Sequence, residues 1–268
     1  ARRPEQVIGM HFFSPVAKMP LLEVIPSSRT APEAVSTAVA FGRRMGKTAI
    51  VVQDAPGFWV NRILGPYMNE AAHLLVAGVG PADIDRAMVQ FGFPVGPITL
   101  LDEVGLDVAQ HAGEVLHTAF GERLAPPPAL AVLVKDGRLG RKTGKGFFVY
   151  TKGKKGGVDP AIYPLLGVQP NGGIPGAEIV QRLTCAMLNE AARAVGEGVV
   201  RNPRDGDIGA IFGFGFPPFR GGPLRYLDDL GADRVYADLQ RLAERLGPRF
   251  APCEVVVEQA RARTRFYS

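Results

Sequence analysis

Two side chains near the start of the chain have the types needed to move a proton. His11 ends one apolar stretch, residues 7–10, and Glu23 lies inside another, residues 21–25. A histidine titrates near neutral pH and can take a proton from an alcohol when a partner fixes its tautomer and stabilises the imidazolium. An unpaired carboxylate within an apolar strand is costly, so Glu23 is the candidate partner. The spacing alone leaves open that His11 is a structural residue at a strand end.

A third polar side chain, Asn61, falls in the first turn of a predicted long helix. It lies at the border between the apolar stripe of that helix and its polar side. Taken alone, a polar residue near a helix start is more often a surface residue than part of a site. The pattern therefore marks Asn61 as a candidate only together with His11 and Glu23.

The elements that would carry His11 and Glu23 alternate short apolar runs with turn residues. Residues 7–10, 21–25 and 49–52 are predicted strands, and residues 32–45 have helical composition with a proline near their start. The order strand, strand, helix, strand is too small for a domain. It resembles the closing part of an α/β domain whose earlier strands are absent.

The period of the apolar residues changes after residue 57. Positions 60 to 75 carry an apolar stripe at three-and-four spacing, which predicts a long helix with a kink at Pro66. Further helices are predicted near residues 81–91, 97–103 and 106–120, each bounded by Gly or Pro. From about residue 55 onward we expect a mainly α structure.

This helical unit is duplicated. Val60, Arg62, residues 69–72 and residues 78–79 recur 120 positions later, and the segment Phe91-Gly92-Phe93-Pro94 recurs as Phe214-Gly215-Phe216-Pro217. The position that matches Asn61 holds Gln181, and nothing like His11 precedes the second copy. Only the first copy therefore has the residues for chemistry.

Composition narrows the class of protein. The 268 residues are 46% hydrophobic, with no run of eighteen uncharged apolar residues, which predicts a soluble, cytoplasmic globular protein without a transmembrane segment. Two cysteines, Cys185 and Cys253, are too few for a disulfide framework, and we expect no metal site. The net charge is +5, and seven cations without an acid among them fit one bound anion better than nucleic acid: Arg138, Arg141, Lys142, Lys145, Lys152, Lys154 and Lys155. A solvated linker explains residues 152–155 equally well.

Four motifs resemble those of 3-hydroxyacyl-CoA dehydrogenases, and they stand in the same order as in that family. They are Gly9-Met10-His11-Phe12-Phe13-Ser14-Pro15-Val16, Met19-Pro20-Leu21-Leu22-Glu23-Val24-Ile25, Pro56-Gly57-Phe58-Trp59-Val60-Asn61-Arg62 and Gly140-Arg141-Lys142-Thr143-Gly144-Lys145-Gly146-Phe147-Phe148. The resemblance covers nearly the whole chain. Short members of the family carry one helical unit, so the tandem copy resembles the multifunctional kind, the alpha subunits of bacterial fatty-acid oxidation complexes.

The resemblance implies a role for five residues. His11 is the general base that removes the 3-hydroxyl proton, and Glu23 holds and polarises it. Asn61 contacts the substrate near the reacting carbonyl. Ser14, where the family often has asparagine, and Lys142 are the residues implied to contact the NAD cofactor.

The implied fold is mainly α, with tandem dehydrogenase C-terminal helical domains preceded by the last strands of a truncated, Rossmann-type NAD-binding domain. The expected boundaries are residues 1–54 for the NAD-binding remnant, 55–150 for the first helical domain, 151–175 for a linker and 176–268 for the second helical domain. No G-x-G-x-x-G turn follows a strand. We therefore expect a fragment that binds NAD weakly and does not turn over alone.

The implied activity is NAD-dependent oxidation of (3S)-3-hydroxyacyl-CoA to 3-ketoacyl-CoA in fatty-acid β-oxidation, with an acyl-CoA as substrate and a thiolase beta subunit as a candidate partner. Two alternatives stay open. A non-catalytic assembly module would have the duplicated helices but no need for the set His11, Glu23 and Asn61. Another dehydrogenase with a helical domain, acting on 6-phosphogluconate or a short 3-hydroxy acid, fits the helices but not the motif around His11.

Overall fold

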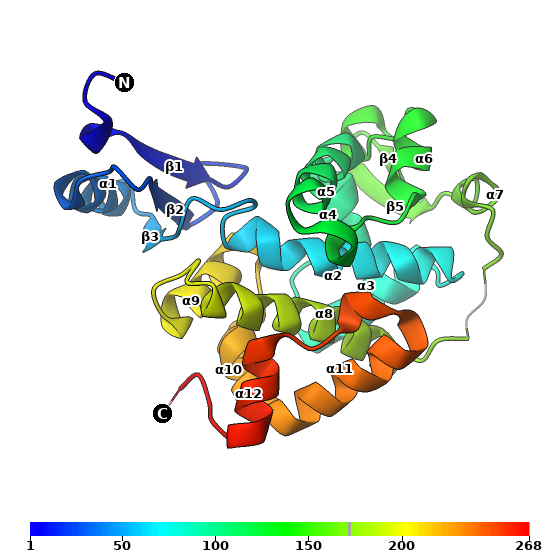
Figure 1. Ribbon diagram of the computed structural model, residues 1–268. Helices are drawn as coiled ribbons and strands as arrows, with labels where there is room; N and C mark the ends of the chain where they lie inside the picture. The colour runs from blue at the N-terminus through cyan, green and yellow to red at the C-terminus, as the bar shows by residue number, and fades with distance from the viewer. Residues whose placement is uncertain (171–172, 268) are drawn as a thin grey trace. The chain divides into compact units, whose positions relative to one another are not determined.

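The structure is a computed structural model that describes residues 1–170 and 173–267 (Figure 1). The strands in this part are β1 (Ile8–Phe12), β2 (Leu21–Pro26), β3 (Thr48–Val51), β4 (Phe148–Thr151) and β5 (Lys154–Val158). They form a three-stranded sheet in the order β1-β2-β3 and a separate two-stranded hairpin, β4-β5. Strand β2 is antiparallel to β1 and parallel to β3.

Helices make up most of the rest of the described chain. The α-helices are α1 (Pro32–Arg44), α2 (Val60–Val76), α3 (Pro81–Phe91), α4 (Pro97–Val104), α5 (Leu106–Phe120), α6 (Ala129–Lys135), α7 (Ile162–Leu166), α8 (Gly176–Gly196), α9 (Pro203–Phe214), α10 (Pro223–Leu230), α11 (Ala232–Leu246) and α12 (Glu254–Ala262). Short 3-10 turns occur at Pro4–Gln6, Gly121–Leu124, Arg141–Thr143, Pro218–Arg220 and Pro248–Phe250. Several helices begin with a proline, because this residue lacks the N–H that a first turn leaves unpaired.

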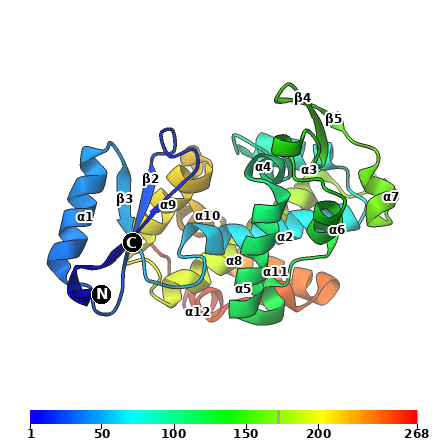
Figure 2. The same ribbon diagram turned by 90° about the horizontal axis from the view of Figure 1, so that it is seen from above.

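The small sheet is covered on both faces (Figures 1 and 2). On one face, Leu22 and Val24 of β2 pack with Ala38 of α1 in a buried cluster. Side chains alternate along a strand, so Leu21 and Glu23 point to the opposite face. That face meets α9, where Gly213 lies against Leu21. The sheet therefore holds Glu23 in a fully covered position on β2.

The predicted order of strand, strand, helix, strand is confirmed, and so are the predicted helices. The helix expected at residues 32–45 is α1, and the apolar stripe from residue 60 forms α2, which continues through Pro66. The helices expected near residues 81–91, 97–103 and 106–120 are α3, α4 and α5. The periodicity of the apolar residues was sufficient to place these elements.

The expected linker, residues 151–175, contains regular structure in its described part. Strand β5 pairs with β4, and α7 follows with Ile162 fully buried. The glycines and lysines of β5 have no apolar alternation, so the sequence did not predict a strand there. The pairing partner and the hairpin turn define it instead.

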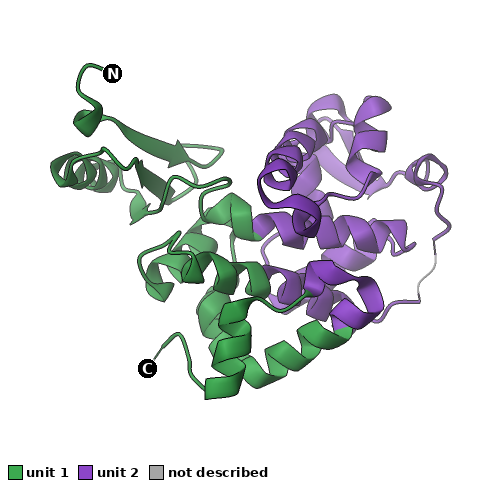
Figure 3. Cartoon of the chain, viewed as in Figure 1, with its two compact units in different colours: residues 1–63, 188–241, 251–268 green, residues 64–187, 242–250 purple. Residues whose placement is uncertain are grey.

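Two compact units make up the described chain (Figure 3). Unit 1 comprises residues 1–63, 188–241 and 251–268, and unit 2 comprises residues 64–187 and 242–250. The division falls within α2, α8 and α11, whereas the predicted domain boundaries follow the duplication. Those boundaries stay a prediction.

Each unit contains the same two buried caps, supplied by matching residues of the two copies. In unit 2, the Asp85 carboxylate accepts from the backbone N–H of Ile98, at 2.8 Å, at the start of α4. In unit 1, Asp207 accepts from the N–H of Leu224, also at 2.8 Å, at the start of α10. A buried carboxylate at a helix N-terminus satisfies N–H groups that the helix leaves unpaired.

The second cap holds an extended segment after each helical copy. Asp102 accepts from the N–H groups of Phe147 and Phe148, both at 2.9 Å, and Asp228 accepts from those of Phe266 and Tyr267 at the same distance.

No helix in the described residues has the length and apolar composition to cross a membrane.

Candidate active site

His11 and Glu23 lie directly opposite each other in the antiparallel pair of β1 and β2. Opposite residues of such a pair present their side chains on the same face, at close separation. The distance from His11 Nδ1 to Glu23 Oε2 is 2.6 Å. The sequence predicted this contact, and the structure contains it.

Glu23 is completely buried and is held by more than His11. Its Oε1 accepts hydrogen bonds from the backbone N–H of Trp59, at 3.2 Å, and of Val60, at 3.0 Å. Val60 is the first residue of α2, and the N-terminus of a helix favours a negative charge. The carboxylate therefore has partners on both oxygens, which offsets the cost of its burial.

The turn that precedes α2 aims these N–H groups at Glu23. Gly57 has φ of 75° and Phe58 has φ of 46°, so two consecutive residues adopt the left-handed conformation. A bulky residue such as Phe58 rarely adopts this conformation, and its cost is accepted where the surroundings fix it. The centroid of the Phe58 ring lies 5.5 Å from that of the His11 ring, and the centroid of the Phe13 ring lies 4.6 Å from it.

The hydrogen bonds assign the proton on His11. A carboxylate oxygen can only accept, so Nδ1 carries the hydrogen and the neutral imidazole keeps its free lone pair on Nε2. The His11 side chain is 28% exposed while Glu23 is buried. The hydrogen bond to Glu23 thus fixes the tautomer and the orientation of the His11 imidazole, which can act as a base at Nε2.

Two other predicted residues belong to unit 1. Asn61 is the second residue of α2, next to Val60, and is half-buried. Ser14 follows β1 and is exposed. Their positions along the chain place Asn61 one residue after the N–H group that holds Glu23, and Ser14 three residues after His11.

Lys142 belongs to unit 2, where its Nζ lies 2.5 Å from Oδ1 of Asp107. This hydrogen bond lowers the pKa of the Asp107 carboxyl. Acids from other parts of unit 2 also reach the predicted basic strip: Arg138 pairs with Asp159 at 2.7 Å, and Lys155 lies 3.5 Å from Asp85. These cations are therefore paired with carboxylates that the local sequence did not show.

Trp59 is a residue of the site that sequence reasoning missed. It is fully buried, its backbone N–H holds Glu23, and its indole Nε1 donates to the carbonyl of Gly206 on α9 at 2.8 Å. It is the single tryptophan of the sequence and stands two residues before Asn61, which was the available signal. Its partner lies 147 positions along the chain, which no local pattern reveals.

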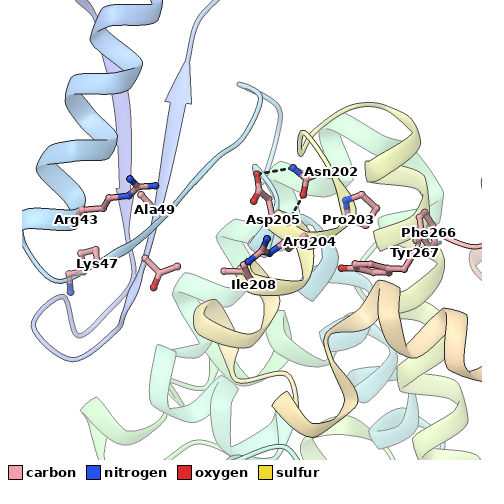
Figure 4. A pocket seen from close by; sticks show the side chains of 11 residues that line it. Arg43, Lys47, Ala49, Asn202, Pro203, Arg204, Asp205, Ile208, Phe266 and Tyr267 are labelled. Atoms are coloured by element: carbon pink, nitrogen blue, oxygen red, sulfur yellow. Dashed lines mark hydrogen bonds between the residues drawn. The ribbon is translucent and has the colours of Figure 1, made fainter.

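A separate open hollow of about 790 Å³ lies elsewhere in unit 1 (Figure 4). Its lining includes Arg43, Lys47, Arg204 and Tyr267, but neither His11 nor Glu23. Lys47 Nζ donates to the carbonyl of Met19 at 2.7 Å, so this cation already has a partner. The hollow is thus separate from the histidine site, because neither His11 nor Glu23 lines it.

Comparisons with known proteins show a family relationship. The family description "3-hydroxyacyl-CoA dehydrogenase, C-terminal domain" matches residues 57–150 and 179–264, and the description "3-hydroxyacyl-CoA dehydrogenase, NAD binding domain" matches residues 1–55. The fatty acid oxidation complex subunit alpha of Shewanella loihica is 53% identical over 268 residues. The match covers 100% of this chain and 38% of that relative, so the chain spans less than half of its length.

Solved structures show the same relationship. The chain resembles 3-hydroxybutyryl-CoA dehydrogenase from Escherichia coli K12 with a TM-score of 0.83 and 27% identity, covering 97% of this chain and 71% of the other. It resembles the dehydrogenase part of multifunctional enzyme 1 from C. elegans with a TM-score of 0.70 and 28% identity, covering 96% and 60%. With its buried Glu23, its oriented His11 and both family domains matched, the chain belongs to the 3-hydroxyacyl-CoA dehydrogenase family.

Proposed function

We propose that this chain supplies the proton-transfer pair for NAD-dependent oxidation of (3S)-3-hydroxyacyl-CoA to 3-ketoacyl-CoA in fatty-acid β-oxidation. The observation that carries the proposal is the chain of contacts from the N-terminus of α2 through Glu23 to His11. A scaffold without activity has no use for a carboxylate buried behind a half-exposed histidine. This arrangement favours an enzyme over the alternative of a non-catalytic assembly module.

The residues divide the work of oxidising an alcohol. His11 takes the 3-hydroxyl proton on Nε2 as the C3–H bond gives up its hydride, so that a C=O bond forms. Glu23 faces the imidazolium that results and stabilises its charge at a distance of 2.6 Å. Asn61 is proposed to donate a hydrogen bond to the substrate oxygen, because its amide follows Val60 at the start of α2.

NAD accepts the hydride in this family. We propose that Ser14 and Lys142 contact it, since Ser14 follows the strand that ends near His11 and Lys142 belongs to a family motif. The sequence contains no glycine-rich turn after a strand, and such a turn with the helix behind it is what holds a pyrophosphate. We propose that the NAD-binding domain is truncated in this chain, and therefore that the 268 residues alone bind NAD weakly.

Substrate and partner follow from the same family. An acyl-CoA is the proposed substrate, and a thiolase beta subunit is the proposed partner, a proposal supported by the match to a subunit of a fatty acid oxidation complex. Co-purification of the two subunits tests the partner. A cytoplasmic location stays a prediction of the sequence, to be tested by cell fractionation.

The activity is tested in a chimeric enzyme, in which this chain replaces the matching segment of the Shewanella loihica alpha subunit. NADH formation is followed by its absorbance with (3S)- and (3R)-3-hydroxyacyl-CoA. We expect turnover of the (3S) substrate only. A folded chimeric enzyme that oxidises neither substrate would reject the proposed function.

The cofactor proposal has its own measurement. Calorimetry of the 268-residue chain with NAD should show dissociation constants in the millimolar range or no binding, compared with about micromolar binding for the chimeric enzyme. Micromolar binding to the isolated chain would show that the cofactor site lies within these residues.

A further inference from the structure

Helix α9 lies so close to Trp59 that its two facing positions, Gly206 and Gly209, have no room for a side chain. A Cβ added at Gly206 would lie 2.7 Å from Trp59 Cζ2. One added at Gly209 would lie 2.9 Å from Trp59 Cδ1 and 2.8 Å from Ile50 Cδ1 on β3. Real Cβ atoms essentially never come this close to another heavy atom. A glycine within a helix is destabilising relative to alanine, so the two on α9 must be offset by the packing that they permit.

The close approach fixes the indole ring and the backbone attached to it. Trp59 Nε1 donates to the Gly206 carbonyl at 2.8 Å, and the Trp59 side chain is fully buried. The backbone N–H of the same residue donates to Glu23. A displacement of the indole by a few tenths of an ångström would therefore move one of the two backbone groups that hold the carboxylate.

The matching positions on α3 of the first copy and α8 of the second carry other residue types. Counting from the shared prolines Pro81 and Pro203, the matches of Gly206 and Gly209 are Ile84 and Ala87 on α3, and the match of Trp59 is Ile179. Ile84 and Ile179 are buried aliphatic residues of unit 2. The aromatic ring and the two glycines of unit 1 thus match three buried aliphatic residues of unit 2.

We propose that α9 of the second helical copy is the positioning element of the proton-transfer pair, acting through Gly206, Gly209 and Trp59 on Glu23 and His11. The second copy carries no reacting group of its own but sets the orientation of Glu23 and His11, which lie on the strands before the first copy. The catalytic meaning of this inference rests on the proposed function. The positioning itself is a property of unit 1 and can be measured without turnover.

The test uses Gly209→Ala and Trp59→Phe in the 268-residue chain. In the parent chain, NMR of the imidazole nitrogens should show His11 as the neutral tautomer with hydrogen on Nδ1, and the Trp59 and Val60 amides should exchange slowly. In both variants we expect mixed tautomers at His11 and about tenfold faster exchange of the two amides. Trp59→Phe removes the indole donor and keeps most of the aromatic volume, so it gives the answer if Gly209→Ala does not fold.

The matched control is Gly113→Ala on α5 of unit 2, where an added Cβ meets only Pro126 at 3.6 Å. It should leave His11 and both amides unchanged. Folded Gly209→Ala and Trp59→Phe chains with the parent tautomer and parent exchange rates would overturn the inference. If the chimeric enzyme fails to oxidise either substrate while the variants change His11 as expected, the proposed function falls and the positioning role stands.

Discussion

The two helical copies share their structural framework and differ where chemistry is proposed. Asp85 and Asp207 cap helices in the same way, and Asp102 and Asp228 each hold two backbone N–H groups of a later segment. Two buried ion pairs also join the copies, each between an arginine of one copy and a glutamate of the other. Arg62 pairs with Glu190 in unit 1, and Arg182 pairs with Glu70 in unit 2. These groups keep each copy folded, since a buried charge without its partner is costly.

The differences lie at the start of α2 and along α9. Asn61 stands two residues after Trp59 in the first copy, whereas Gln181 stands two residues after Ile179 in the second. Among the described strands, a histidine occurs in β1, before the first copy, and not in β4 or β5, which precede the second. Both copies therefore carry the caps and the ion pairs, whereas the glycines that lie against Trp59 occur on α9 alone of the two matching helices.

The largest expected effect tests whether the chemistry belongs to His11, on the strand that precedes the first copy. His11→Ala in the chimeric enzyme should lower kcat about a thousandfold, because general-base catalysis contributes roughly 10²–10⁴-fold. The acyl-CoA KM should change little. Steady-state NADH formation measures both constants.

Its matched control is His111→Ala, which removes an exposed histidine of α5. This change should leave kcat within about twofold, the usual effect of a distant surface substitution. Full activity of His11→Ala would remove the distinction between the copies.

The next effect is a pH dependence that belongs to the second copy. Burial raises the pKa of the Asp207 carboxyl from 3.8 to about 6, against the lowering effect of the hydrogen bond from Tyr267. The folded chain therefore binds this proton more tightly than the unfolded chain. The extra stability is complete below about pH 3.8 and is lost as the pH rises to about 6, an amount of at most ~3 kcal/mol.

Asp207→Asn should remove this part of the pH dependence. Urea unfolding of the 268-residue chain at pH 4, 5, 6 and 7 gives the free energy of unfolding for both proteins. The difference between parent and variant should vary with pH between 4 and 6 and level off above that range. A constant difference would show that Asp207 does not titrate there.

A smaller effect compares the matched residues Asn61 and Gln181 directly. Asn61→Ala in the chimeric enzyme should lower kcat/KM about tenfold, because a hydrogen bond to the reacting oxygen is lost. Gln181→Ala should leave kcat/KM within about twofold. Equal losses in the two variants would mean that both positions act through stability, which thermal unfolding of each variant would show.

The smallest effect concerns the segment that each copy holds at its end. The Tyr267 hydroxyl donates to Asp207 at 2.6 Å, whereas in the first copy Asp85 receives the Lys155 ammonium at 3.5 Å. Tyr267→Phe should lower the free energy of unfolding by about 1 kcal/mol, the usual net value of one hydrogen bond. The same change at Tyr236, on α11, is the control and should have a smaller effect in urea unfolding.

The sequence was sufficient for the first three strands, for α1 to α5 and for the contact between His11 and Glu23. Apolar periodicity and prolines placed α1 to α5, and the internal repeat predicted a second set of helices. Glu23 was a candidate partner of His11 because an unpaired carboxylate in an apolar strand is costly, and the resemblance of the surrounding motifs to the family favoured the pair. Strand β5 was missed, because its lysines and glycines lack alternation and its partner strand alone defines it.

The sequence by itself determined the residue types, the repeat and the local helices, since these follow from short-range periodicity and from motifs read along the chain. The tertiary structure decided which contacts hold His11 and Glu23 in place. The turn at Gly57 and Phe58 aims backbone N–H groups at Glu23, and α9 fixes Trp59 through a contact between residues 147 positions apart. Such contacts depend on the distance between folded backbones, which no local pattern of residues encodes.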